Sequence, residues 1–376
     1  MKQLRTYWPL VVFGVLLINY LIWGRALAGS VIAGKAPDWV QTLADAFYHR
    51  LSAERNRLDL NYLLRKADQV LLRLGFVMLA GSLLVWSVRR NPAFRRKLHA
   101  PVLYELSNKR MVLLQGICML GLVSFCFTWG TDYEAYEKLS GFYQPVGLLS
   151  VLHAEFPTAA ILYWCHVLML AMAVMIAFNL QKKLSGRAWL AYLPLFLLYL
   201  YLQAFFFSFE KTDHRFAPLF WLLLSLLIWS FRPAGPANNG QWLGVARIAL
   251  AGQYLLSGLE KVFTSGPQWA SAETLRVHIL NSQVPAGMAI VEMDWLLSLL
   301  AIGTAVLQLG FISQLWWPGS RWLWIGGALA FHLGSWLLLD IGDPLSPWVF
   351  GLLFFGPWET KAATRVPARD GDGHLH

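Results

Sequence analysis

Charged residues are scarce in this sequence. Only 14% of its 376 residues are Asp, Glu, Lys or Arg, whereas 57% are hydrophobic. A soluble domain has about 25% charged and about 45–50% apolar residues. The composition therefore excludes an ordinary soluble protein and indicates a membrane protein with several helices. Nineteen tryptophans suit the aromatic belts that form at the two membrane surfaces.

Motifs that would indicate several common chemistries are also missing. The sequence has no Cys/His cluster with zinc spacing, no glycine-rich phosphate loop and no nucleophile elbow. The three cysteines all lie in apolar runs, so we expect small buried residues and neither disulfides nor a metal site: Cys118, Cys126 and Cys165. No basic patch interleaved with aromatic residues lies outside the apolar runs, so we expect no nucleic-acid partner. Carboxylates are scarce inside the runs, which argues against a proton-coupled transporter.

Long apolar runs dominate what is present. The first covers about 7–27, and eight more follow at about 70–88, 112–130, 158–180, 188–209, 216–231, 242–263, 288–312 and 321–340. Most approach the ~20 residues that a helix needs to cross a bilayer. A shorter run at about 345–357 suits a half-length helix. We therefore predict an all-α fold, a polytopic integral membrane helical bundle with nine transmembrane helices, or ten if the last run crosses.

The domain organisation follows from the same runs. We expect a single membrane domain over 1–360 and a polar, disordered tail over 361–376. The first run is long for a signal peptide, which is the alternative, so we expect a retained helix. A further amphipathic helix is predicted from Asp38 to about Arg57, lying in the membrane interface or packed on another helix. Its apolar residues share one face: Trp39, Leu43, Phe47 and Leu51.

The distribution of lysine and arginine predicts the orientation. The loops after the second and fourth runs are basic, which places them and the N-terminus in the cytoplasm. We expect the membrane to be the cytoplasmic (inner) membrane of a bacterium. The acidic loop around Asp132, Glu134 and Glu137 then faces outward. The first loop, also basic, conflicts with this arrangement, and the orientation inverts if the first run does not cross.

Three ionisable side chains at the outward face are candidates for a functional site. Lys261 lies near the outer end of the run 242–263, His214 begins the helix after a polar connection, and His332 lies within the ninth run. Each has a structural alternative: Lys261 snorkels to the headgroups, the connection is a polar turn, and His332 is a packed, hydrogen-bonded residue. A lysine in a low-dielectric pocket loses proton affinity and can then act as a neutral base. Tyr254 and Ser257 share the helix face of Lys261.

Three ordered motifs resemble the HTTM superfamily, the membrane domain shared with the vitamin K-dependent gamma-glutamyl carboxylases. The segment Glu210-Lys211-Thr212-Asp213-His214 is similar to the acidic-Lys-Thr segment and its following Asn/Asp-His pair. The segment from Ser257 to Val262, followed by Trp269, is similar to the small-Gly-aliphatic-x-Lys-aliphatic motif. Phe331-His332, followed by Ile341-Gly342 and Pro344, is similar to the Phe-His motif. The resemblance is best over about 187–357.

The resemblance implies a chemistry and a set of site residues. Lys261 would be the general base, with His214 and His332 as further catalytic residues. Cofactor binding would fall to five residues: Lys211, Asp213, Tyr254, Ser257 and Trp269. The cofactor would be a reduced, vitamin K-like quinone, with O2 and CO2 or bicarbonate as co-reactants.

The partners that the resemblance implies are membrane lipids, a quinone or other lipid-soluble molecule, and a peptide or protein substrate. Because no large substrate-binding domain follows Lys361, we expect quinone or lipid chemistry more than protein carboxylation. The alternative is a non-catalytic HTTM-type protein that binds a lipid, a peptide or a partner complex.

Overall fold

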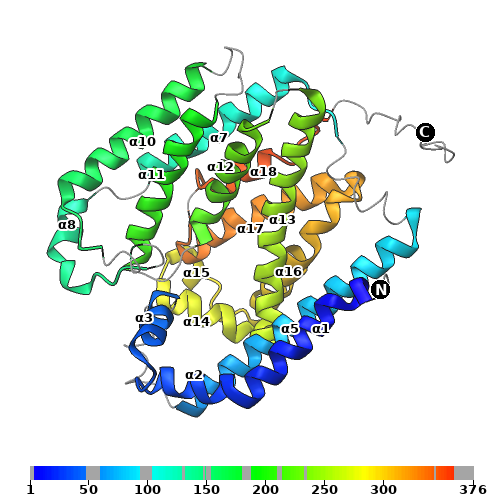
Figure 1. Cartoon of the computed structure of the whole chain (residues 1–376). Helices are drawn as coiled ribbons and strands as arrows, with labels where there is room; N and C mark the ends of the chain where they lie inside the picture. Colours follow the sequence, from blue (N-terminus) through cyan, green and yellow to red (C-terminus); the bar gives the residue numbers. More distant parts are fainter. Residues whose placement is uncertain are drawn as a thin grey trace, which may run out of the picture. The chain divides into compact units, whose positions relative to one another are not determined.

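The computed structural model describes residues 4–47, 60–93, 104–128, 132–146, 149, 154–179, 188–209, 214–232, 235–342 and 344–359. All regular elements in these ranges are helices, which confirms the all-α prediction (Figure 1). The tail over 361–376 lies outside the described residues. The chain forms two compact units, which are described separately, and the single domain over 1–360 stays a prediction.

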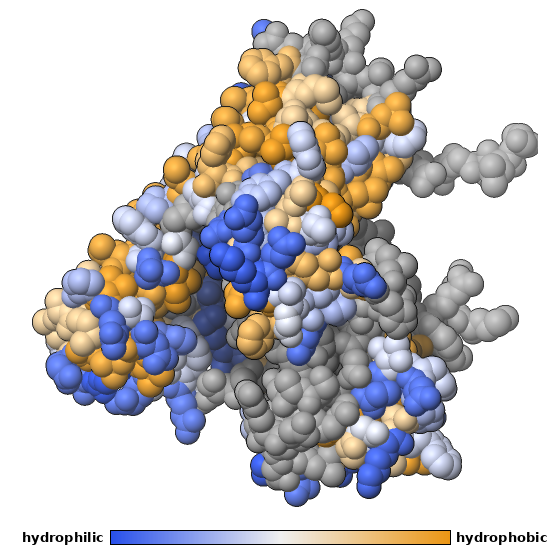
Figure 2. All heavy atoms as spheres, turned by 90° about the vertical axis from the view of Figure 1, so that its left-hand side faces the viewer, coloured by the Kyte–Doolittle hydropathy of each residue, from blue (hydrophilic) through white to orange (hydrophobic). Residues whose placement is uncertain are grey.

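Six helices among the described residues are long and apolar enough to cross a membrane: Gly14–Ile32, Asn108–Thr128, Ala159–Phe178, Trp189–Phe207, Asp294–Leu315 and Pro318–Leu339. Figure 2 shows apolar side chains over large areas of one face, as expected for a surface that contacts lipid. The chain is therefore a helical integral membrane protein. The predicted count of nine to ten spans is higher than this number.

The first unit contains Met1–Leu98, Asp132–Tyr163 and Tyr201–Asp213. Its helices are α1 (Leu4–Asn19), α2 (Arg25–Ile32), α3 (Asp38–Phe47), α5 (Leu60–Arg90) and α8 (Tyr133–Lys138). A π-helical turn, Tyr20–Gly24, joins α1 to α2, so the first apolar run is helical, as predicted, with an interruption. The α1 helix packs along α5.

The predicted amphipathic helix corresponds to α3, whose described part ends at Phe47. Its apolar face is open, because Trp39 is 73% and Leu43 48% exposed. No described part of the unit covers these two side chains, which suits the membrane-interface interpretation better than helix packing. The rest of the predicted segment, 48–57, lies outside the described residues.

The second unit contains His99–Thr131, Trp164–Leu200 and His214–His376. Its helices are α7 (Asn108–Thr128), most of α10 (Ala159–Asn179) and α11 (Trp189–Phe207), α12 (Ala217–Ser230), α13 (Pro236–Ser265), α14 (Ala272–Ser282), α15 (Pro285–Met288), α16 (Asp294–Gly310), α17 (Arg321–Leu339) and α18 (Pro347–Leu353). The long α13 helix packs against α12 and α16, and α18 packs against α7 and α17. The α18 helix lies in the last apolar run, and its seven residues are fewer than the half-length helix predicted there.

The predicted eighth run, 288–312, is wrong at its start. Gln283 adopts a left-handed conformation with φ 54° and ends α14, and Pro285 begins the short α15. The spanning helix α16 begins only at Asp294, whose carboxylate in the first turn suits the positive end of the helix dipole. The apolar residues before Asp294 therefore belong to a turn.

Glycines allow α13 to approach its neighbours closely. A Cβ at Gly240 would lie 1.7 Å from the Tyr104 carbonyl oxygen, so the segment before α7 lies directly on the helix. A Cβ at Gly258 would lie 3.0 Å from Leu309 of α16. These contacts fix the position of the helix that carries Tyr254 and Lys261.

Candidate functional site

The helices α13 and α17 bring two of the predicted site residues together. Tyr254 is 3% exposed, and its Oη lies 2.6 Å from Nε2 of His332. Aromatic rings enclose the pair: Phe311 stacks on Tyr254 with ring centroids 4.2 Å apart, and Trp348 stacks on His332 at 5.6 Å. The polar ring of His332 thus has a hydrogen-bond partner inside an apolar region.

The second ring nitrogen of His332 is not used by this bond. Among the described residues, Tyr254 is the hydrogen-bond partner of His332, through Nε2. When the tyrosine donates its O–H to Nε2, the imidazole proton must sit on Nδ1. The arrangement can therefore present a neutral imidazole N–H to a ligand oxygen.

Lys261 lies near the carboxyl end of α13 and is half-buried. Its Nζ donates to the Ser257 carbonyl oxygen at 3.5 Å and lies 5.1 Å from the centroid of the Trp269 ring. No carboxylate in the described part of the chain forms an ion pair with this ammonium. Ser257 and Trp269, predicted to bind a cofactor, thus contact the predicted base itself.

The predicted residues form two groups, one around Tyr254 and one around Lys261 of α13. Tyr254 and Lys261 are seven residues apart, which is two turns and about 10 Å along the helix axis at ~1.5 Å per residue. No described contact joins the Tyr254–His332 pair to Lys261. Two cavities of this unit, of about 270 Å³ on α12 and α13 and about 90 Å³ on α14, α16 and α17, are lined by other residues.

The first motif of the resemblance falls largely outside the described residues. Lys211 and Asp213 are not described, and of His214 only the backbone is, as the first residue of a 3₁₀ turn, His214–Phe216. This turn packs against α18, the helix that carries Trp348. The chain at His214 therefore runs next to the helix whose tryptophan stacks on His332.

Sequence reasoning missed a buried arginine in the same helix. Arg247, inside the predicted run 242–263, is 2% exposed and donates to the carbonyl oxygens of Phe354 at 2.8 Å and Gly356 at 2.5 Å. It also forms an ion pair with Glu359, and Arg321 of α17 reaches the same carboxylate at 2.9 Å. The signal was present, because a charge inside an apolar run is costly and needs a partner.

These contacts form a clamp on the segment 354–359. Burial would raise the pKa of Glu359, but the charges and hydrogen bonds of the two arginines outweigh burial and lower it. Arg110 of α7 adds a bond of 2.6 Å to the Trp358 carbonyl oxygen. Because Arg247 already has these partners, we interpret the clamp as a structural feature that fastens the segment to α7, α13 and α17.

No protein-family model, curated protein or solved structure matches this chain. The likeness to the HTTM superfamily therefore stays a resemblance of motifs. In the described part of the chain, no group of three or more His, Cys, Asp or Glu side chains is placed to hold a metal ion.

Proposed function

We propose that this chain is an HTTM-type integral membrane enzyme that acts on a reduced quinone or another lipid-soluble substrate, with Lys261 as general base. The observation that supports it most is the 2.6 Å bond between Tyr254 and His332, which leaves Nδ1 of the imidazole for a ligand. Lys261 follows two turns later on the same helix face. The aromatic rings around the pair suit a flat, apolar ring.

Each residue has a role in this proposal. A bound quinol would supply the acidic hydroxyl that the base deprotonates. His332 holds an oxygen of the ring through Nδ1–H, and Tyr254 fixes the imidazole tautomer. Lys261 accepts the proton, and the Trp269 ring stabilises the ammonium that results. Lys211, Asp213 and His214 would complete the site.

The proposal includes nine spans, with the N-terminus in the cytoplasm of a bacterial inner membrane and Lys261 on the outer side. Besides the six apolar helices, α5 has 31 residues and α13 has 30, both longer than the ~20 needed to cross. The α12 helix has 14 residues and supplies a short ninth span. Seven residues of α18 extend about 10 Å at ~1.5 Å per residue, which is too short for a tenth.

Substitution of Lys261 tests the chemistry. A neutral amine is needed in a base, and a guanidinium stays protonated. We expect Lys261→Ala and Lys261→Arg both to lose turnover of a reduced naphthoquinone by about 10²–10⁴-fold, the range for a positioned base. Thermal unfolding in detergent should remain close to that of the wild type. An arginine variant with wild-type turnover would exclude Lys261 as the base.

A non-catalytic binding protein is the second candidate, and one observation favours it. The Lys261 ammonium already has a carbonyl oxygen and a tryptophan ring as partners, which suits a permanent charge. Such a protein would bind a lipid, a peptide or a partner complex. It predicts that the purified chain retains naphthoquinol without consuming it, and that Lys261→Arg behaves as the wild type.

A further inference from the structure

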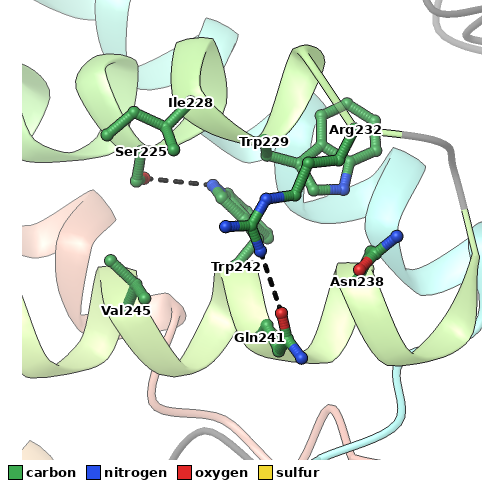
Figure 3. A pocket seen from close by; sticks show the side chains of 8 residues that line it. All are labelled: Ser225, Ile228, Trp229, Arg232, Asn238, Gln241, Trp242 and Val245. Carbon is green, nitrogen blue, oxygen red and sulfur yellow. Dashed lines mark hydrogen bonds between the residues drawn. The ribbon is translucent and has the colours of Figure 1, made fainter.

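We infer that the cavity between the end of α12 and the start of α13 binds the phosphate group of an anionic phospholipid. The cavity, seen in Figure 3, has a volume of about 270 Å³, and neither Tyr254 nor Lys261 lines it. Eight residues line it: Ser225, Ile228, Trp229, Arg232, Asn238, Gln241, Trp242 and Val245. None of the eight is acidic.

Arg232 supplies the charge that recognises an anion. Figure 3 shows its guanidinium extending across the cavity toward α13, where Nη1 donates to Gln241 Oε1 at 3.0 Å. Gln241 is the partner of Arg232 among the described residues, so most of the five N–H donors of the guanidinium remain for a ligand. A planar guanidinium fits phosphate oxygens with two parallel hydrogen bonds.

The helix that closes the cavity adds a second favourable field. The α13 helix begins at Pro236, and Asn238 and Gln241 line the cavity from its first two turns. The amino end of a helix carries a partial positive charge and favours anions. The charge of Arg232 and the dipole of α13 both attract an anion in this cavity, because Arg232 lies opposite the amino end of the helix.

The remaining walls are apolar or already hydrogen-bonded. Trp242 Nε1 donates to Ser225 Oγ at 3.0 Å, and Trp229 Nε1 donates to Asn239 Oδ1 at 3.1 Å, so both indoles are fixed. Ile228 is 51% and Val245 48% exposed, which places an apolar strip next to the cavity. A ligand that uses both parts has an anionic group and a hydrocarbon chain.

A phospholipid is the source that this combination favours over free phosphate. The cavity lies at the ends of two adjacent membrane helices, where tryptophan is enriched and headgroups reside. Basic pockets between helices on one membrane side commonly hold anionic headgroups. Free phosphate would use Arg232 and the helix end but would gain nothing from Ile228 and Val245.

The site is preformed, because the start of α13 is held by contacts that do not involve a ligand. Asn239 donates from Nδ2 to the Leu106 carbonyl oxygen at 3.2 Å and to Asn108 Oδ1 at 2.8 Å. Gly240 lies directly on the Tyr104 carbonyl. Binding therefore does not need to order this end of the helix, which improves affinity.

The test is lipid binding to delipidated protein in detergent, measured by native mass spectrometry with phosphatidylglycerol and phosphatidylcholine. We expect the wild type to prefer phosphatidylglycerol, and Arg232→Gln to weaken its binding at least about tenfold, because the charge-assisted hydrogen bonds of the guanidinium to phosphate are lost. Arg215→Gln makes the same change at the other end of α12 and should bind as the wild type. Thermal unfolding should be alike in all three proteins, since both arginines are exposed.

Three results would overturn the inference. They are equal binding of the two lipids by the wild type, equal loss in the Arg232 and Arg215 variants, or no loss in either. Competition by inorganic phosphate is a further part of the test. If it displaces phosphatidylglycerol at equal concentration, the site recognises free phosphate and the lipid assignment is wrong.

Discussion

At the scale of single residues, two buried tyrosine hydroxyls in the second unit differ in their hydrogen bonding. Tyr254 Oη bonds to His332 Nε2, whereas Tyr192 Oη is buried without a hydrogen-bond partner among the described residues. Removing a hydroxyl that satisfies a buried partner leaves that partner unpaired, at a cost of about 1–3 kcal/mol. We expect Tyr254→Phe to lower the free energy of unfolding by this amount.

Tyr192→Phe is the matched control, because it removes a buried hydroxyl that bonds to nothing described. It should leave stability unchanged or raise it slightly. Both variants can be measured by denaturant or thermal unfolding in the same detergent. Equal effects of the two substitutions would mean that the Tyr254–His332 bond contributes nothing to the fold.

Residue-level prediction worked where the information was local. The helical repeat placed Tyr254 and Ser257 on the face of Lys261, and Ser257 does contact it. The pairing of Tyr254 with His332 could not be predicted, because the two are 78 residues apart and meet only through the packing of α13 and α17. The charge of Arg247 inside an apolar run is visible in the sequence, but its partners are not, because Phe354, Gly356 and Glu359 lie more than 100 residues further along the chain.

At the scale of elements, α13 depends on one glycine for its contact with the chain before α7. A methyl group at Gly240 would overlap the Tyr104 carbonyl, whereas a methyl group at Gly252 would meet nothing within 4 Å. We expect Gly240→Ala to destabilise the protein by about 1–3 kcal/mol through overpacking. Gly252→Ala, in the same helix, should stabilise it by about 0.5–1 kcal/mol through helix propensity.

Thermal unfolding of both variants in detergent checks this expectation. The contrast matters more than either value, since the two substitutions share the same chemistry and the same helix. If Gly240→Ala is as stable as Gly252→Ala, the segment at Tyr104 does not lie on α13 as described.

The clamp on the segment 354–359 makes a prediction at the same scale. Glu359→Gln leaves Arg247 and Arg321 buried without their counter-charge, and breaking a buried ion pair costs about 3–5 kcal/mol. Glu273→Gln is the control, because that carboxylate pairs with Arg276 but is 70% exposed, and exposed pairs contribute less than about 1 kcal/mol. Similar unfolding temperatures for the two variants would show that the clamp is not stabilising.

The carboxylate of Glu359 also makes the stability of the fold depend on pH. The pKa of Glu359 is lower in the folded protein than the ordinary value. Its stabilisation is complete above the unfolded pKa, about 4.3, and is lost as the pH falls through the lower folded pKa. Unfolding temperatures measured from pH 7 down to 3 should therefore fall more steeply for the wild type than for Glu359→Gln.

At the scale of the whole molecule, the basic loops predict which ends of the helices face the cytoplasm. Cysteines placed at Ala93 and Ser185, in a background without the three native cysteines, should resist a membrane-impermeant thiol reagent in intact cells. A cysteine at Ser140 should react. Labelling of the first two with protection of the third would invert the orientation and move Lys261 to the cytoplasmic side.

The composition was enough to predict a helical membrane protein. It was not enough to predict the number of spans. An apolar run gives no sign of a turn inside it, as α14, α15 and the late start of α16 show. A run can also form a helix too short for a full crossing, as the seven residues of α18 do. Turn geometry at single positions, such as the left-handed Gln283, decides these boundaries.

The clamp also has a consequence for biogenesis. Glu359 follows Arg247 by 112 residues, and ribosomes add about 5–20 residues per second. Arg247 is therefore synthesised about 6 to 22 s before its counter-charge exists, and until then its guanidinium must be solvated by water, headgroups or the insertion machinery. The clamp can therefore close only after Glu359 has been synthesised, and its closing pairs opposite charges.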